Sequence, residues 1–348
     1  METVTGDRLR TVRSGLSSSA QRVTELLVRQ ALRRNPRCGT DANEDDAHRL
    51  SVAAVLVAWS PAETVRCATA LRETLETTGA RWRLVVVAQR PMDLPPELDV
   101  LEGDNSFREF SGWKVGLDAI ARDERPDVVV LANDRFGSYR YDHLRYMDAA
   151  VLRLIAETDA LTGAINHYPR EVHSLGHDLS AWVRTNLFAT TPSCLERVGG
   201  PILPELLQLD ARVPRDWPGG LELPREAGVS ELHQRLLRSY LTGSGEEPFR
   251  RLWHRARPAS ADWWPELRAK VLCVLAEQLL SARCREAGSP VMDFRTARIL
   301  TTFYPEDETF RRTVLRLSSR DATEAVRVLS ARGQLALALR ALLPEGLR

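Results

Sequence analysis

The sequence predicts an α/β protein with a mostly parallel, twisted sheet flanked by helices and a helical C-terminal region. Short, continuous apolar runs recur between residues 50 and 190, as expected for strands that are buried on both faces. Segments of helical periodicity separate these runs, an alternation typical of a parallel sheet. From about residue 219 onward, helical patterns dominate.

The first predicted strand covers residues 52–59, VAAVLVAW, and is apolar throughout. Ser60 and Pro61 follow, with Glu63 three residues after the serine. Serine at the N-cap, proline at the first helical position and glutamate completing a capping box predict that a helix starts here. We expect this helix to stop at Gly79.

The same order of strand and helix continues along the chain. Further strands are predicted at residues 82–88, 98–101, 127–132, 161–165 and 181–190. Helices are predicted at residues 110–122 and 143–157, with a short one starting at Pro192. Right-handed crossovers place the carboxyl ends of parallel strands along one edge, where open α/β sheets bind ligands. The polar residues expected at that edge are Ser60, Gln89, Asp104, Asn105, Asn133 and Asp134.

Three regions are expected along the chain. Residues 1–49 combine an amphipathic helix with an acidic linker, residues 50–215 form the α/β domain, and residues 216–348 form the helical region. The predicted helices outside the α/β domain are residues 18–34, 230–241, 265–287, 293–303 and 321–343. Few contacts should cross the acidic linker, so residues 1–45 should be separable from the rest.

Composition argues against several classes of protein. The formal net charge is +1, so no strong field attracts nucleic acid. The five cysteines lie far apart without a CxxC pair, which favours a reducing compartment over a disulfide framework. No apolar run approaches the roughly 18 residues that a membrane span needs. Arg8, Arg10 and Arg13 interrupt any signal-peptide core, so we expect a cytoplasmic protein.

The abrupt change from VVVLA to Asn133 and Asp134 is the most informative feature of the sequence. A carboxylate at the carboxyl end of a strand is well placed to hold a divalent cation on the phosphates of a nucleotide. Such a metal would neutralise the charge that builds on a departing diphosphate. The alternative is that Asp134 is a loop carboxylate or a cap for the next turn.

The order of these parts resembles that of family 2 glycosyltransferases and the related rhamnan-synthesis group of the GT-A fold. The matching pieces are Asn105, the segment Lys114-Val115-Gly116-Leu117, the pair Asn133-Asp134 and the later WVRTNLFATTPSCLERVGG. The resemblance covers roughly residues 50–200. It implies a Rossmann-like nucleotide-binding half and transfer of a sugar from a nucleotide-sugar donor to a glycan, lipid-linked or small-molecule acceptor.

The resemblance also implies a set of donor-binding residues. Asn133 and Asp134 would hold the diphosphate together with Mg²⁺ or Mn²⁺, and Asp134 would be the metal ligand. The other residues expected to line the donor pocket are Ser60, Asp104, Asn105 and Lys114.

The sequence departs from the family pattern at three positions. Lys114 stands where the helix of the family often carries asparagine. Gln89 replaces the aspartate that usually follows the second strand and contacts the nucleotide base, and Ala132 replaces the first aspartate of Asp-x-Asp. A catalytically inactive GT-A-like protein that binds or assembles with a partner is therefore the alternative to an enzyme. A nucleotidyltransferase would need a Gly-rich, basic loop after the first strand, and residues 59–62 provide none.

An inverting transfer needs a base near the acceptor hydroxyl. The candidates for this catalytic role are His173, His177, Asp178 and Glu205. The spacing of the two histidines could suit zinc on a helix, but Pro169 and Gly176 favour a loop there. Local hydrogen bonding is the alternative role for all four residues.

A later stretch interleaves tryptophan with arginine: Trp253, Trp263 and Trp264 lie among Arg255 and Arg257. Such residues could sit at a lipid interface, where a lipid-linked acceptor would be met. Packing of the indole rings between helices is the alternative. Peripheral contact with the inner face of the membrane is expected only if these side chains are exposed.

Overall fold

The computed structural model describes residues 50–320, apart from residues 140, 169, 217–222, 224–226, 244–252 and 254, together with residues 328 and 329. Its main sheet contains β1 (Ser51–Ala58), β2 (Arg81–Ala88), β3 (Asp99–Glu102), β4 (Val128–Asn133), β5 (Leu161–His167), β8 (Ala181–Thr190) and β9 (Val291–Asp293). A separate hairpin pairs β6 (His173–Ser174) with β7 (His177–Asp178).

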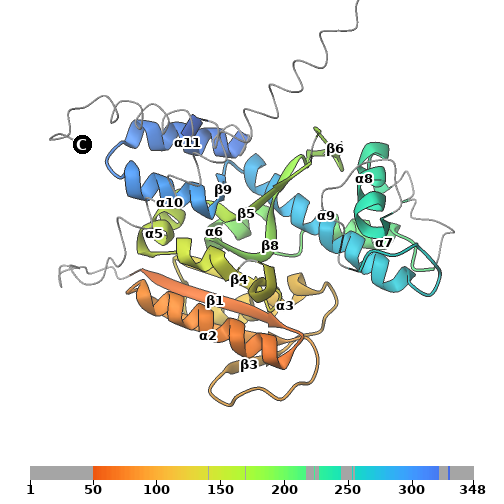
Figure 1. Cartoon of the computed structure of the whole chain (residues 1–348), viewed down its shortest axis with the longest axis horizontal. Helices are drawn as coiled ribbons and strands as arrows, with labels where there is room; N and C mark the ends of the chain where they lie inside the picture. Colours follow the sequence, from red (N-terminus) through yellow and green to blue (C-terminus); the bar gives the residue numbers. More distant parts are fainter. Residues whose placement is uncertain are drawn as a thin grey trace, which may run out of the picture.

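Helices flank this sheet on both faces (Figure 1). They are α2 (Pro61–Thr77), α3 (Glu109–Asp123), α4 (Phe136–Tyr139), the 3-10 helix η1 (Tyr141–Tyr146), α5 (Ala149–Thr158), α6 (Pro192–Val198), α7 (Pro204–Arg212), α8 (Glu231–Thr242), α9 (Trp264–Glu286), α10 (Phe294–Phe303) and α11 (Glu308–Arg320). The α/β architecture with a mostly parallel sheet is therefore confirmed.

The strand order is β3-β2-β1-β4-β8-β5-β9. The pairs β3-β2, β2-β1, β1-β4 and β5-β9 are parallel, whereas β8 runs antiparallel to both of its neighbours. The carboxyl ends of β1, β2, β3, β4 and β5 therefore point toward the same edge of the sheet.

The apolar run of β1 divides its side chains between two cores, because successive side chains of a strand point to opposite faces. Ala53, Val55 and Val57 belong to the core formed with α3, α6 and α9. Leu56 and Ala58 belong to the core formed with α2, α5 and α10. Burial on both faces explains why this strand lacks an alternation of polar and apolar residues.

Strands β5 and β8 extend beyond the end of β4 (Figure 1). Ala132 of β4 pairs with Leu187, whereas β8 continues to pair with β5 as far as Trp182 and Ala181. The five residue steps from Leu187 to Trp182 correspond to about 17 Å of strand. The register between β5 and β8 shifts after Gly163, so a bulge lies beside the carboxyl end of β4.

The C-terminal helical region shares the sheet and the core of the preceding residues. Strand β9 pairs with β5, and α9 packs against β8. Val271 and Leu275 of α9 lie in the same apolar core as Val55 and Val57 of β1. Residue 216, the boundary expected from the sequence, therefore separates two segments that share one core.

Several elements differ from the sequence-based prediction. The segment expected as one helix at 143–157 is divided into η1 and α5, because Asp148 accepts a hydrogen bond from the Val151 amide and starts a new helix. Strand β9 and helices α7 and α11 were not predicted. The helix expected at residues 18–34 lies outside the described residues, as does nearly all of that expected at 321–343. Among the described helices, none combines the length and apolarity needed to cross a bilayer.

Candidate functional site

The end of β1 is a topological switch point, because the helices around it lie on opposite faces of the sheet. Helix α2 connects β1 to β2 on one face, and α3 connects β3 to β4 on the other. Open α/β sheets bind ligands in the crevice that such a reversal creates. The residues that follow β1, β2, β3 and β4 therefore form the candidate site.

Asp134 follows β4 and is buried, with 1% of its surface exposed. Its Oδ2 atom accepts hydrogen bonds from the amides of Trp59 and Ser60, both at 2.7 Å. Its own amide donates to the Val57 carbonyl at 2.9 Å. Burial raises the pKa of Asp134 above its usual value, although the two amides oppose the shift. The side chain thus joins the turn after β1 to the end of β4.

This hydrogen bonding also explains why the capping box predicted at Ser60 is wrong. Ser60 is the N-cap of α2, but its side chain makes no capping hydrogen bond. In a capping box, Glu63 would accept a hydrogen bond from the Ser60 amide. That amide instead donates to Asp134, and Glu63 pairs with Arg66.

A divalent cation does not fit at Asp134 in this arrangement. One carboxylate oxygen accepts two amides, and the other, Oδ1, is fully covered without a partner among the described residues. The neighbouring amide oxygen of Asn133 accepts a hydrogen bond from the Arg135 amide at 3.1 Å. Mg²⁺ needs several open positions for water and phosphate oxygens, and this buried geometry provides none.

Gln89 follows β2 and carries a buried amide that has no hydrogen-bond partner among the described residues. Only 6% of the residue is exposed. The side chain lies against Gly103 and Gly112, where an added Cβ atom would come within 2.9 Å and 2.2 Å of its Nε2 atom. Glycine at both positions therefore makes room for a polar side chain at the switch point.

The loop between β3 and α3 contains two non-glycine residues with positive φ, Asn105 at 52° and Arg108 at 51°. Asp104 stabilises the loop by accepting hydrogen bonds from the Ser106 amide and hydroxyl, both at 2.9 Å. These bonds hold the pKa of Asp104 below its usual value. The Arg108 Nε atom is buried without a partner in the described part of the chain. Non-glycine residues with positive φ cluster at ligand-binding loops and switch regions.

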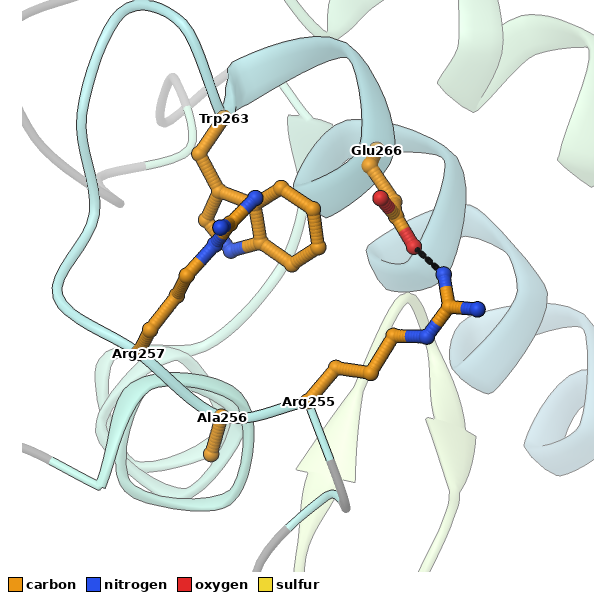
Figure 2. Close-up of a pocket in the computed structure, with 5 residues that line it drawn as sticks. All are labelled: Arg255, Ala256, Arg257, Trp263 and Glu266. Atoms are coloured by element: carbon orange, nitrogen blue, oxygen red, sulfur yellow. Dashed lines mark hydrogen bonds and ion pairs between the residues drawn. The ribbon is translucent and has the colours of Figure 1, made fainter.

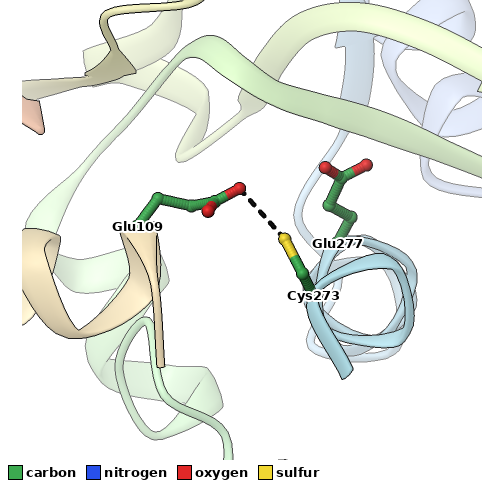
Figure 3. Close-up of side chains that lie close together, drawn as sticks. All are labelled: Glu109, Cys273 and Glu277. Atoms are coloured by element: carbon green, nitrogen blue, oxygen red, sulfur yellow. Dashed lines mark hydrogen bonds between the residues drawn. The ribbon is translucent and has the colours of Figure 1, made fainter. Parts of the chain in front are cut away.

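A second polar cluster lies between α3 and α9 (Figure 3). Glu109 begins α3, whereas Cys273 and Glu277 lie one turn apart on α9, and one ligand atom from each residue lies within 4.8 Å of the others. The Cys273 thiol donates to Glu109 Oε1 at 3.1 Å. The Thr185 hydroxyl donates to Glu277 Oε1 at 2.8 Å. All three cluster residues are at most 8% exposed.

Lys270 lies one turn before Cys273, with 3.9 Å between its Nζ atom and the Cys273 sulfur. Burial by itself would lower the pKa of Lys270, but the neighbouring Cys273, Glu277 and Glu109 hold it above the usual range. Burial also raises the pKa of the Cys273 thiol, so the sulfur is protonated at neutral pH. The cluster therefore contains one ammonium group and two buried carboxylates.

The structure gives the remaining predicted residues other partners. Lys114 is exposed in the second turn of α3 and pairs with Asp118 at 2.5 Å. Asp178 accepts a hydrogen bond from the Ser180 amide at 2.9 Å. Glu205 pairs with Arg283 at 3.3 Å.

The two histidines lie on the hairpin, at the far end of the β5-β8 extension. His177 Nδ1 lies 2.6 Å from Glu286 Oε1. His173 and Asp178 are opposite each other in the backbone register of the β6-β7 hairpin. The histidines and Asp178 thus gather at this hairpin, away from Ser60, Asn133 and Asp134, which meet at the switch point.

In the Trp/Arg-rich stretch, the Arg257 side chain lies over the Trp263 ring (Figure 2). Trp253 and Trp263 stack with ring centroids 5.6 Å apart, and the Arg257 guanidinium lies 3.4 Å from the Trp263 ring centroid. Both indoles are buried. An open pocket of about 400 Å³ lies beside Trp263 and is lined by Arg255, Ala256, Arg257, Trp263 and Glu266. Membrane contact was expected only if these side chains were exposed. The rings of Trp253 and Trp263 are buried, so they do not meet that condition.

Comparisons with known proteins identify no family. No family model and no curated protein matches the sequence. A solved structure, mannosyltransferase PcManGT from Pyrobaculum calidifontis in complex with GDP-Man and Mn²⁺, aligns over 94% of this chain and 92% of that chain. The identity is 14% and the TM-score is 0.30, so the similarity is remote.

Sequence reasoning missed Arg108 and the α3-α9 cluster. Arg108 lies two residues before the helix predicted at 110–122, which was a usable signal for an anion site. Cys273 and Glu277 have the i, i+4 spacing that places two side chains on one helix face. Glu109, however, is 164 residues from Cys273, and a glutamate in the first turn of a helix is ordinary.

Proposed function

We propose that this protein binds a nucleotide-sugar at the carboxyl edge of β1, β2 and β4 and transfers the sugar to a glycan, lipid-linked or small-molecule acceptor. The observation that carries the proposal is the buried, unpartnered amide of Gln89 beside Gly103 and Gly112. Leaving such a group unsatisfied costs about 1–3 kcal/mol. A nucleobase edge would offer it both a donor and an acceptor once the loop that carries Gly103 moves aside, because both amide atoms are covered.

The rest of the donor would lie along the neighbouring loops. Arg108, at the start of α3, is placed to pair with a diphosphate, since guanidinium groups and helix N-termini both favour phosphate. Ser60, Asn133, Asp104 and Asn105 surround the same edge. Asp134 holds the turn after β1 in place by accepting hydrogen bonds from its amides. In this proposal Asp134 therefore shapes the pocket. Mg²⁺ or Mn²⁺ would have to reach the phosphates from another direction.

The acceptor side of the proposal centres on His177. Glu286 orients its imidazole through Nδ1, and a second nitrogen remains for a substrate hydroxyl. The hairpin lies about 17 Å or more beyond the end of β4 along the strands. That separation favours a role for His177 in binding an extended acceptor over a role as the catalytic base.

A thermal-shift screen of UDP-, GDP- and dTDP-sugars, with and without Mn²⁺, tests the function. A ligand at 100 times its Kd adds about 2.7 kcal/mol to folding stability, which corresponds to an increase of about 5 °C in Tm. We expect at least one nucleotide to give such an increase. A flat response to every nucleotide would contradict the proposal.

Gln89→Leu separates recognition from folding. Leucine keeps the apolar contacts and removes the unsatisfied amide, so the apo-protein should be as stable as the wild type or up to about 2 kcal/mol more stable. Nucleotide affinity should fall at least about tenfold, because two hydrogen bonds to the base are lost. The matched control, Gln208→Leu at an exposed position of α7, should change neither quantity. Unchanged affinity in Gln89→Leu would show that this amide does not read the base.

A non-catalytic GT-A-like binding or assembly protein is the second candidate. The burial of Asp134 favours it, because the residue expected to hold the metal has its carboxylate occupied. Nucleotide-sugar binding without transfer or hydrolysis over a panel of acceptors would select this candidate.

A further inference from the structure

The cluster between α3 and α9 has the ligands, the burial and the unbalanced charge of a metal site. We propose that Glu109, Cys273 and Glu277 bind a thiophilic divalent cation of the zinc class. The proposal is independent of the nucleotide-sugar function, because none of these residues takes part in the donor site described above.

The carboxylates of Glu109 and Glu277 are buried together between the two helices. Glu109 is 6% exposed and Glu277 is 8% exposed. Within the described residues neither carboxylate forms an ion pair, and Glu109 accepts a hydrogen bond only from the weak thiol donor of Cys273. In the described part of the chain, Lys270 is the one cation beside these two carboxylates, so one negative charge of the cluster is left without a counter-ion, and burying such a charge costs several kcal/mol. A bound cation would offset that cost.

The geometry is the second argument. Zinc ligands lie about 2.0–2.3 Å from the metal, so the ligand atoms of one site lie about 3–4 Å apart. The three ligand atoms here already lie within 4.8 Å of one another. Two of them share one face of α9, and the third is held at the first turn of α3. Small side-chain rotations would therefore complete three of four tetrahedral positions.

The donor set decides the class of metal. A thiolate favours zinc over Mg²⁺ and Ca²⁺, which prefer oxygen ligands alone. Thr185 acts as an outer partner by holding one oxygen of Glu277 at 2.8 Å. Such outer hydrogen bonds fix the orientation of metal ligands. Binding would convert the Cys273 S–H bond into a sulfur–metal bond and release its proton to solvent.

Lys270 is the group that competes with the metal. Its ammonium lies 3.9 Å from the Cys273 sulfur, so its positive charge would repel a cation bound at the cluster. Lys270 is only half-buried, and its flexible side chain can turn toward solvent when a metal enters. Removing this positive charge should therefore strengthen metal binding.

Metal binding to the full chain tests the site directly. The purified protein is stripped with a chelator and titrated with Zn²⁺, and with Co²⁺ as a spectroscopic probe. We expect about one ion per chain, with a cobalt–thiolate charge-transfer band. Cys273→Ser should abolish that band, and Glu277→Gln should weaken binding at least about 100-fold. Thr185→Val should weaken it by about 10–100-fold, the usual effect of removing an outer hydrogen bond.

Two further variants keep the test decisive. Lys270→Gln should bind Zn²⁺ at least about tenfold more tightly, because the competing charge is gone. Cys67→Ser, at a buried cysteine of α2 outside the cluster, should retain the cobalt band. Absence of the band in both the wild type and Lys270→Gln, with both proteins folded by circular dichroism, would overturn the proposal. A band that survives Cys273→Ser would also overturn it.

Discussion

Two aspartates flank β4 and tie it to β1 at opposite ends. Asp127, before the strand, accepts hydrogen bonds from the Ser51 amide at 2.7 Å and its hydroxyl at 3.0 Å. Asp134, after the strand, accepts the amides of Trp59 and Ser60. Asp127 is exposed to water and Asp134 is not. The two residues therefore make similar hydrogen bonds in very different surroundings.

This pair leads to a prediction on stability. Asp134→Ala should lower the free energy of unfolding by about 2–4 kcal/mol, because two amide groups lose their acceptor in a buried site. Asp127→Ala should cost less than about 1 kcal/mol, because water can replace the lost carboxylate. Urea denaturation monitored by circular dichroism measures both values. Equal losses for the two variants would contradict the importance of burial at Asp134.

The charge of Asp134 can be tested separately with Asp134→Asn. A carboxyl whose pKa is raised on folding stabilises the protein most below its usual pKa of 3.8, and that contribution is lost as the pH rises through the raised value. Asparagine keeps an oxygen for the two amides and stays neutral. Asp134→Asn should therefore remain within about 1 kcal/mol of the wild type at pH 7. A loss as large as that of Asp134→Ala would show that the charge itself is needed.

Elements were predictable from the sequence where one apolar face or run dominates. The strand at β1 follows from a continuous apolar run. The predicted range 181–190 coincides with β8, Ala181–Thr190, although Arg184, Thr185 and Asn186 interrupt its apolar residues. Strand β9 has only three residues, Val291–Asp293, and precedes a helix directly, so no periodicity could reveal it. Its place in the sheet is set by pairing with β5, a contact between distant segments.

The candidate site was predictable only in part, for the same reason. The position of Asn133 and Asp134 at the sheet edge follows from strand order, but the occupation of Asp134 by the β1 turn depends on contacts 74 and 75 residues away. Gln89 was identifiable by its position after a strand. The burial of its amide depends on Gly103 and Gly112, which pack against it from a later part of the chain, so the sequence could not reveal it.

Helix α8 contains a buried histidine that should make stability depend on pH. His233 is fully buried, and burial lowers its pKa to about 4 from 6.5. The folded protein therefore favours neutral imidazole, and this contribution is present above pH 6.5 and lost as the pH falls toward 4. The shift corresponds to about 3 kcal/mol.

The prediction is that His233→Phe flattens the dependence of unfolding free energy on pH between 6.5 and 4. Phenylalanine keeps the ring contact with Tyr168, whose centroid lies 5.7 Å from that of His233, and has no group to titrate. Urea midpoints measured across this range provide the test. His173→Phe, at an exposed hairpin position, is the control and should retain the wild-type slope. A wild-type slope in His233→Phe would refute the assignment.

At the scale of the whole molecule, the C-terminal helical region completes the domain that begins at β1. Helix α9 covers β8 and shares a core with β1, and β9 extends the sheet. A chain ending at residue 215 would keep the switch point but expose the apolar residues that α9 covers. Exposed apolar surface costs about 25 cal/mol per Å², and burying each aliphatic side chain of α9 is worth about 1.5–3 kcal/mol.

The last prediction is therefore that residues 1–215 do not fold independently. The loss of several such side chains exceeds the 5–15 kcal/mol by which domains are usually stable, so the fragment should show no cooperative thermal transition and should bind a hydrophobic dye. Deleting residues 1–45 is the matched comparison, because the acidic linker predicts few contacts with the rest. The protein without residues 1–45 should still unfold cooperatively. Its nucleotide affinity should stay within about threefold of that of the full chain. Cooperative unfolding of the 1–215 fragment would instead make the C-terminal helices a separate domain, and α9 would then be an attached layer over an already complete core.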